Sequence, residues 1–296
     1  MSYQPAPILE LNDTRLNGLD LHLLLKCEYQ NHPFISGNKW WKLKYNLEEA
    51  QRLKKETLLT FGGAYSNHIY ATAAAAKELG LKSIGIIRGE KILPLNPTLA
   101  FAESCGMRLE FLSREDYRHK TEEVFIKQLH NKFGDFYLIP EGGTNELAVK
   151  GVTEFASSVL HETEFDYLCL PVGTGGTMAG MVIGFEGSKT ILGFSVLKGG
   201  EFLNDEVKKW SGHSIDNWSI VEDCHFGGYA KTTKELEIFI TEFETQHHVP
   251  LDQVYTAKMM FGVFDLVKKG VFKKGTTILV LHTGGLQGRS TREFNF

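Results

Sequence analysis

Lys39 is the side chain with the clearest capacity for chemistry, because it follows a Ser-Gly-Asn turn at residues 36–38 and stands at the start of a predicted helix. The positive end of the helix dipole and nearby cations such as Lys42 and Lys44 disfavour the charged ammonium and lower its pKa. Such a shift matters, because an ordinary lysine with a pKa of about 10.4 is almost fully protonated at pH 7 and cannot act as a nucleophile. The alternative is a solvated lysine on an amphipathic helix.

A glycine-rich segment, Gly173-Thr174-Gly175-Gly176-Thr177, lies between an apolar stretch and another predicted helix. Its consecutive backbone N–H groups carry little side-chain obstruction and suit a phosphate. No Gly-Lys-Ser/Thr follows, and Met178 stands where a dinucleotide fingerprint has its third glycine, so a single phosphate monoester fits better than a pyrophosphate. A plain tight turn is the alternative.

Two further loops bring polar side chains to the ends of predicted strands. Ser66 and Asn67 offer a hydroxyl and an amide in the loop of residues 62–68, although both are also common helix N-caps. Thr283 brings a hydroxyl to the end of the last predicted strand, where a turn is again the alternative. Pyridoxal phosphate requires four such groups together: a lysine for its aldehyde, an amide for its phenolate, a loop for its single phosphate and a hydroxyl for its pyridine nitrogen.

Strands and helices are predicted to alternate along the chain. The predicted strands cover residues 21–28, 57–61, 82–88, 108–112, 136–139, 166–172, 190–196 and 276–281. The predicted helices cover residues 40–54, 69–79, 97–105, 114–131, 146–160, 178–185, 201–210, 234–246 and 258–269. We therefore expect an α/β protein of two domains, each with a largely parallel sheet flanked by helices. Residues 44–155 are expected to form the smaller domain, and residues 1–43 and 156–296 the larger one, which holds the cofactor phosphate.

Composition and charge exclude several other classes of protein. The 296 residues are 42% hydrophobic and carry a formal net charge of -4 without basic blocks, so we expect no nucleic-acid partner. No window reaches the ~18 apolar residues that a membrane span requires, and residues 1–10 do not resemble a secretion signal, which makes the cytoplasm the expected location. Four scattered cysteines and the lack of a His-Glu-x-x-His motif predict neither disulfides nor a catalytic metal.

The sequence resembles the pyridoxal-phosphate-dependent family of 1-aminocyclopropane-1-carboxylate deaminases and D-cysteine desulfhydrases. The resemblance runs over nearly the whole chain and rests on the segments at residues 36–43, 62–68, 171–180, 254–260 and 281–285. It implies a tryptophan-synthase-β-like fold, which is fold type II among pyridoxal-phosphate enzymes, and a homodimer acting on a small amino acid.

The resemblance also implies roles for individual residues. Lys39 would be the Schiff-base lysine, Asn67 would bond the phenolic oxygen, and Thr283 would face the pyridine nitrogen. Ser66 would be a hydroxyl on the substrate side, and Tyr255 would be an active-site tyrosine. Tyr229 matches a second active-site tyrosine, and the phosphate would be held by Gly173, Thr174, Gly175, Gly176 and Thr177.

Two positions favour the desulfhydrases within this family. The deaminases carry glutamate and leucine where this chain has Thr256 and Thr283, whereas the desulfhydrases carry threonine at both. Without a carboxylate to keep the pyridine nitrogen protonated, the cofactor ring withdraws electrons less strongly. This weaker withdrawal suffices for β-elimination, because a thiolate departs readily once the α-proton has been removed. We therefore expect a lyase that releases pyruvate, ammonia and sulfide. The alternatives are a ring-opening deaminase and a cofactor-binding protein without turnover.

The chain also departs from the family pattern close to the expected substrate. Tyr65 stands where glutamine is usual, and Ile69 and Tyr70 replace threonine and arginine. The aromatic side chains of Tyr65 and Tyr70 are expected either to reshape the substrate pocket or simply to pack against their neighbours.

Overall fold

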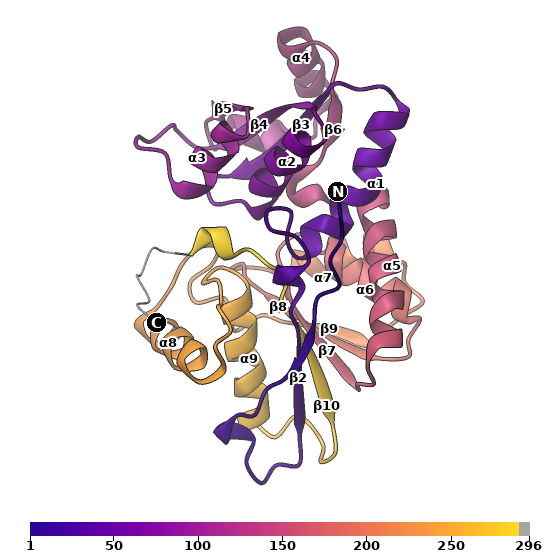
Figure 1. Ribbon diagram of the computed structural model, residues 1–296, viewed down its shortest axis with the longest axis vertical. Helices are drawn as coiled ribbons and strands as arrows, with labels where there is room; N and C mark the ends of the chain where they lie inside the picture. The colour runs from indigo at the N-terminus through magenta and orange to yellow at the C-terminus, as the bar shows by residue number, and fades with distance from the viewer. Residues whose placement is uncertain (290–296) are drawn as a thin grey trace.

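The computed structural model of the protein describes residues 1–289, which form two sheets (Figure 1). The larger sheet has the strand order β1 (Ile8–Glu10), β2 (His22–Lys26), β10 (Thr277–Leu281), β7 (Tyr167–Val172), β8 (Thr190–Ser195) and β9 (Trp218–Val221). The smaller sheet has the order β5 (Met107–Leu112), β4 (Lys82–Arg88), β3 (Thr57–Gly63) and β6 (Tyr137–Ile139). Its neighbouring strands are all parallel, and in the larger sheet the pairing of β1 with β2 is antiparallel.

Helices cover both faces of each sheet. They are α1 (Asn38–Arg52), α2 (Asn67–Glu78), α3 (Pro97–Ser104), α4 (Glu123–Phe133), α5 (Glu146–Glu162), α6 (Gly176–Phe185), α7 (Phe202–Ser211), α8 (Lys234–His247) and α9 (Thr256–Lys268). On the larger sheet, α1, α5, α6 and α7 share one apolar core, whereas α8 and α9 share the core of the opposite face. Strand β7 contributes side chains to both cores, because Leu168 and Leu170 point to the first core and Cys169 points to the second.

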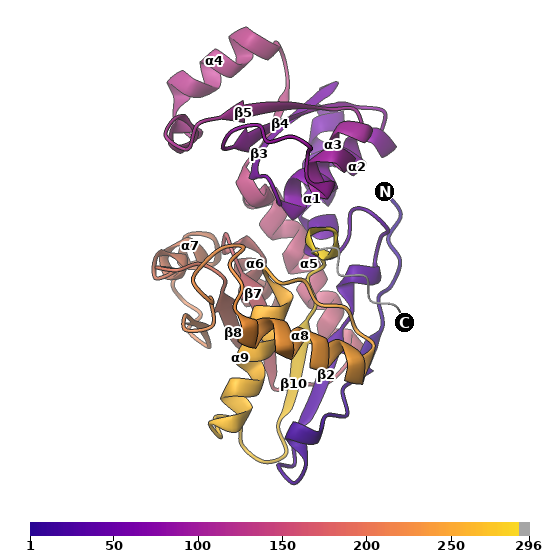
Figure 2. The same cartoon turned by 90° about the vertical axis from the view of Figure 1, so that its left-hand side faces the viewer.

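The smaller sheet also packs against helices on both of its faces. Leu59 and Phe61 of β3 pack with Leu129 of α4 on one face, and Ile87 of β4 packs with residues of α2 and α3 on the other. Figure 2 shows α4 on one side of this sheet, with α2 and α3 on the other. Strands buried on both faces read as continuous apolar runs, which is why the sequence predicts them well.

The α/β class with two largely parallel sheets is confirmed. Two parts of the element prediction were wrong. Residues 114–131 do not form one helix, because a 3₁₀ turn at Asp116–His119 precedes α4, which begins at Glu123. The short strands β1 and β9 were missed. The predicted boundaries after residues 43 and 155 fall inside α1 and α5, two helices that pack together, and these boundaries stay a prediction.

The fold brings the chemically interesting loops to one place between the sheets. The loops after β3, β6, β7 and β10 all follow the carboxyl ends of parallel strands, where α/β proteins bind ligands. Across residues 1–289, no helix is both long enough and apolar enough to span a bilayer. The same residues contain no cluster of three or more His, Cys, Asp or Glu side chains that could hold a metal ion.

Candidate active site

Gly37 and Asn31 fix the turn that presents Lys39. The Gly37 N–H donates to Asn31 Oδ1 at 2.9 Å, and Asn31 Nδ2 donates to the Gly37 carbonyl at 3.0 Å. Gly37 has a φ of 71°, and a Cβ built on it would lie 1.9 Å from the carbonyl oxygen of Thr283. Only glycine therefore allows the start of α1 to meet the end of the last strand so closely. Lys39 is the second residue of α1, which begins two residues before the predicted helix and places Lys39 on its first turn, as expected.

The Lys39 amine is enclosed and weakly engaged. Its Nζ donates to Asn38 Oδ1 at 3.2 Å, and among the described residues it contacts no carboxylate. Burial lowers the pKa of Lys39 to about 8. Lys44, which the sequence suggested as a cationic neighbour, instead donates to Glu154 Oε1 at 2.7 Å outside the cavity, so it plays no part in this shift.

Lys42 lies one helical turn after Lys39 and is almost completely buried, with 1% of its surface exposed. Its Nζ donates to the Gly142 carbonyl at 2.6 Å and to Thr144 Oγ1 at 2.8 Å, and no described carboxylate pairs with it. Burial, and then the charge of Lys39, lower the pKa of Lys42 well below its ordinary value. An anion beside Lys42 would therefore be strongly favoured.

The glycine-rich loop follows β7 and leads into α6. Gly175 has a φ of 76°, and a Cβ at Gly176 would lie 2.6 Å from Thr144 Cγ2, so both positions require glycine. The loop is tied to the lysine turn because Asn38 Nδ2 donates to Thr177 Oγ1 at 2.8 Å. The first N–H groups of α6 have no partner within their helix and form a site suited to a phosphate.

Ser66 and Asn67 begin α2 and face the same cavity. Ser66 Oγ accepts from the Ile69 N–H at 3.3 Å, so this hydroxyl is an N-cap as well as a cavity wall. Asn67 Oδ1 accepts a short hydrogen bond from Gln287 Nε2. The acceptor end of the Asn67 amide is therefore occupied, which leaves Nδ2 as its hydrogen-bond donor.

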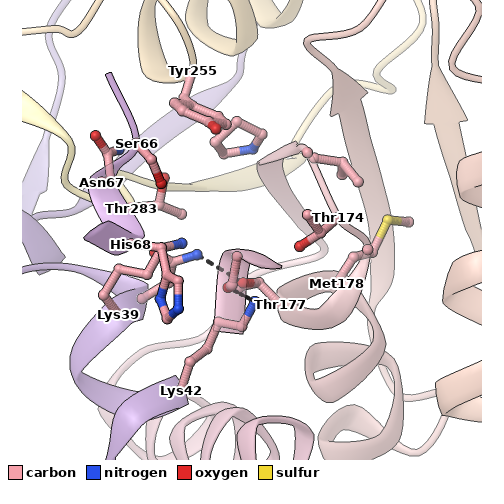
Figure 3. Close-up of a pocket in the computed structure, with 16 residues that line it drawn as sticks. Lys39, Lys42, Ser66, Asn67, His68, Thr174, Thr177, Met178, Tyr255 and Thr283 are labelled. Atoms are coloured by element: carbon pink, nitrogen blue, oxygen red, sulfur yellow. Dashed lines mark hydrogen bonds between the residues drawn. The ribbon is translucent and has the colours of Figure 1, made fainter. Parts of the chain in front are cut away.

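The inner cavity collects most of the predicted site residues (Figure 3). It is lined by Lys39, Ser66, Asn67, Tyr255 and Thr283, together with Gly173, Thr174, Gly175 and Thr177 of the glycine-rich loop. Tyr229 instead lines a larger outer cavity of about 760 Å³, which shares Ser66, Thr174 and Tyr255 with the inner one. The rings of Tyr229 and Tyr255 meet edge to face with centroids 6.0 Å apart.

Thr256, one of the two positions used to separate the deaminases from the desulfhydrases, lines neither cavity. Its Oγ1 donates to Asp252 Oδ2 at 2.6 Å, and its side chain is completely buried. Thr283 therefore remains the threonine of this pair that faces the site.

Sequence reasoning missed His68 as a cavity residue. Thr60 Oγ1 donates to the Ile139 carbonyl at 2.8 Å, so His68 Nε2, 2.7 Å from that hydroxyl, must be the donor to it. His68 Nδ1 is then an acceptor with no partner among the described residues. Burial, with the charges of Lys39 and Lys42, lowers the pKa of His68 well below its ordinary value, which keeps the ring neutral.

Sequence reasoning also missed that Lys42 and Thr144 lie beside the glycine-rich loop, where Thr144 Oγ1 is 2.8 Å from Thr174 Oγ1. The sequence held a signal for each. Lys42 follows Lys39 at the i+3 spacing that places two side chains on one helix face, and Thr144 follows two glycines between a strand and a helix.

The side chains fit pyridoxal phosphate. A buried Lys42 without a carboxylate partner favours a bound anion, and the adjoining loop offers backbone donors in positions that only glycine permits. Lys39 is poised to lose its proton, and the Asn67 amide and Thr283 hydroxyl line the same cavity. When bound, this cofactor supplies an electron sink for carbanions at the α-carbon of amino acids.

Comparisons with known proteins agree with this fit. The sequence profile of the family described as "Pyridoxal-phosphate dependent enzyme" matches residues 1–284. A putative 1-aminocyclopropane-1-carboxylate deaminase of Pyrococcus furiosus is 31% identical over 94% of this chain and 88% of its own length. A bifunctional D-cysteine desulfhydrase/1-aminocyclopropane-1-carboxylate deaminase, mitochondrial, of Arabidopsis thaliana is 30% identical over 97% of this chain and 78% of its own length.

A crystal structure of a homologue of 1-aminocyclopropane-1-carboxylate deaminase matches with a TM-score of 0.83 and 27% identity. The match covers 97% of this chain and 91% of that one. The chain therefore belongs to the pyridoxal-phosphate-dependent enzymes, in the family of 1-aminocyclopropane-1-carboxylate deaminases and D-cysteine desulfhydrases.

Proposed function

We propose that the protein is a lyase that eliminates the β-substituent of a small amino acid, as a D-cysteine desulfhydrase does. The observation that carries this proposal is the lining of the inner cavity, where Thr283 supplies a hydroxyl and none of the described lining residues is Asp or Glu. A hydroxyl cannot hold a pyridine nitrogen protonated as a carboxylate does. The milder electron sink suits departure of a good leaving group better than cleavage of an unactivated ring bond.

Lys39 would hold the cofactor and then act as the base at the α-carbon. With a pKa of about 8 its amine can both take up and release a proton near neutral pH, which is the condition for efficient general base catalysis. Ser66 and Asn67 lie at the start of α2, where a substrate carboxylate is favoured by free N–H groups and the helix dipole.

Tyr255 is the candidate hydrogen-bond donor to the leaving group. Burial is the main reason that its pKa is raised well above 10, so the phenol stays protonated at neutral pH and can donate a hydrogen bond to the departing sulfur. Its ring lies over the glycine-rich loop, with Cε1 3.1 Å from a Cβ built on Gly173. Tyr229 packs against it from the outer cavity and would hold the ring in place.

The proposed reaction converts D-cysteine and water into pyruvate, ammonium and hydrogen sulfide. The Cα–H and Cβ–S bonds break, the sulfur leaves with the bonding electrons and gains a proton, and water hydrolyses the resulting enamine. The second candidate is ring opening of 1-aminocyclopropane-1-carboxylate to 2-oxobutanoate and ammonium. The names of the relatives in Pyrococcus furiosus and Arabidopsis thaliana favour keeping it in view.

The deciding experiment measures pyruvate from D- and L-cysteine and 2-oxobutanoate from the cyclopropane substrate with the same holoenzyme. We expect pyruvate release to be faster by about a hundredfold or more, which corresponds to a barrier difference of only about 2.7 kcal/mol. Lys39→Ala controls for background chemistry. Efficient 2-oxobutanoate release by the wild type would establish the deaminase instead.

A homodimer and a cytoplasmic location are also proposed, on the resemblance to the family. Light scattering during size-exclusion chromatography tests the homodimer, and a mass of one chain would refute it.

A further inference from the structure

The outer cavity is much larger than cysteine requires. Its volume is about 760 Å³, within the range of about 300–1,000 Å³ that holds drug-sized ligands. It opens directly from the inner cavity, since Ser66, Thr174 and Tyr255 line both. A substrate bound at Lys39 therefore has room to extend a longer β-substituent into the outer cavity.

Arg88 places a positive charge in this cavity. It ends β4 at the carboxyl edge of the smaller sheet, paired in register with Gly63 of β3. Its Nη2 lies 3.8 Å from a Cβ built on Gly63, three residues before Ser66, and its Cζ lies 5.9 Å from the centre of the Tyr117 ring. The guanidinium thus lies close to the loop after β3, which carries the Ser66 hydroxyl.

Lys120, the neighbouring cation on the same wall, already has a counter-charge, whereas Arg88 does not. Lys120 Nζ lies 3.4 Å from Glu141 Oε2, and Glu141 also accepts from the Tyr117 hydroxyl at 2.9 Å. On the opposite wall, Lys209 Nζ lies 5.1 Å from the centre of the Trp210 ring and forms no ion pair among the described residues. Within residues 1–289, Arg88 forms no ion pair with a carboxylate.

The remaining wall is suited to a short carbon chain. Phe61 and Leu138 from the smaller sheet and Leu197 after β8 line the same cavity. A cavity that is lined by apolar side chains and by the unpaired Arg88 guanidinium matches a substituent made of methylene groups with an anion at its far end.

We propose that Arg88 binds a carboxylate or similar anion at the far end of the substrate's β-substituent. The substrate class is then a β-substituted amino acid whose leaving group is a thiol that carries an acid. This inference rests on the proposed β-elimination. With S-(2-carboxyethyl)cysteine and water, the Cβ–S bond breaks and the sulfur keeps the electron pair and gains a proton. The products are pyruvate, ammonium and 3-mercaptopropionate.

The test compares S-(2-carboxyethyl)cysteine with its uncharged carbamoylethyl analogue, each as D and L enantiomers, on the holoenzyme. We expect wild-type kcat/KM to favour the acid by about tenfold to a hundredfold, the usual value of a hydrogen bond to a charged group. Arg88→Gln should bring this ratio close to one and leave D-cysteine turnover unchanged, because cysteine has no distal anion. Lys209→Gln, on the opposite wall, is the matched control and should keep the preference.

Two outcomes would overturn the proposal. Equal kcat/KM values for the two analogues in the wild type would mean that no distal anion is recognised. An equal loss of D-cysteine and acid turnover in Arg88→Gln would mean that Arg88 binds the α-carboxylate instead.

A binding measurement separates this proposal from the proposed reaction. Calorimetry with 2-aminoadipate and norleucine, which carry no β-leaving group, reads anion recognition without elimination. We expect 2-aminoadipate to bind the wild type at least about tenfold more tightly than norleucine, and Arg88→Gln to remove the difference. Equal binding of the two ligands by the wild type refutes the Arg88 site even if β-elimination proceeds.

Discussion

The half-buried Lys39 and the buried Lys42 lie one helical turn apart in the inner cavity, and their surroundings suit them to different tasks. Lys42 Nζ donates two short hydrogen bonds, to Gly142 and Thr144, which fix the position of its amine. Lys39 Nζ has a single longer contact with Asn38. An amine that is desolvated and weakly held is free to react, whereas one held by two acceptors can best neutralise an anion.

Capture of the cofactor by the apoprotein should depend on pH through Lys39. Because its pKa is lowered to about 8, the amine is protonated below that pH and cannot attack an aldehyde, and it is neutral above it. The capture rate, followed by absorbance, should rise up to about pH 8 and then level off. After borohydride reduction, peptide mapping should find the pyridoxyl group on Lys39. The control Lys44→Ala should behave as the wild type, and an adduct on another lysine would contradict the assignment.

Lys42→Met should weaken cofactor binding and strengthen the apoprotein. Loss of a charged donor to phosphate is expected to raise the cofactor Kd about tenfold to a hundredfold. Because burial disfavours the protonated form of Lys42, removing this amine should leave the free energy of unfolding of the apoprotein unchanged or higher. Fluorescence titration and urea denaturation measure the two effects. A destabilised apoprotein with normal cofactor affinity would show that Lys42 is only structural.

Asn67→Ala should retain cofactor but change its absorbance and the pH at which that absorbance titrates. Gln287 occupies Asn67 Oδ1, so Nδ2 is the donor available to a phenolate oxygen. A hydrogen bond to a charged acceptor is worth about 1.5–3 kcal/mol, which is enough to move such a titration measurably. Gln287→Ala should produce a smaller change. An unaltered spectrum in Asn67→Ala would mean that Asn67 serves only the start of α2.

At the scale of elements, the start of α9 explains why Thr256 is not a cofactor contact. Asp252 Oδ1 accepts from the N–H groups of Val254 and Tyr255, and its Oδ2 accepts from the N–H and hydroxyl of Thr256. This carboxylate satisfies N–H groups that the helix itself cannot. Thr256 therefore helps to hold Tyr255 in position, a role that its place in the sequence could not show.

Thr256→Glu should destabilise the fold rather than tune the cofactor. A second buried carboxylate beside Asp252 is expected to lower the free energy of unfolding by about 3 kcal/mol or more. Thr241→Glu, on the exposed face of α8, is the control and should change it by only about 0.5 kcal/mol. Urea denaturation measures both. A stable Thr256→Glu protein with a changed cofactor spectrum would restore Thr256 to the cofactor site.

The sequence predicted elements with strong periodicity and missed those set by tertiary contacts. Strand β4 was predicted with its observed bounds, because five consecutive residues from Ser83 to Ile87 are buried and mostly apolar. By contrast, β9 has four half-exposed or exposed residues and exists through its pairing with β8. The site follows the same pattern. Lys39 could be singled out from the local Ser-Gly-Asn turn, whereas the hydrogen-bond partners of Lys42 lie 100 and 102 residues away in the sequence.

At the scale of the whole molecule, the inner cavity is bounded where the start of α1 meets the loop after β10. The Asn38 N–H donates to the Thr283 carbonyl at 3.3 Å, so the loop after β10 rests on the start of α1. Gly285 lies equally close to α2, since a Cβ there would be 2.3 Å from Asn67 Nδ2. The loop after β10 thus contacts both the turn that presents Lys39 and the Asn67 amide at the start of α2.

Gly37→Ala should disrupt this junction. The left-handed φ alone costs about 1–3 kcal/mol for a residue with a side chain, and the added methyl would also collide with the Thr283 carbonyl. We expect the free energy of unfolding to fall by more than about 3 kcal/mol and cofactor capture to be lost. Gly80→Ala is the matched control, because Gly80 has a similar φ of 68° but nothing within 4 Å of its Cβ position. If the two variants lost equal stability in urea denaturation, strain at the turn would account for Gly37 and the close approach to Thr283 would not.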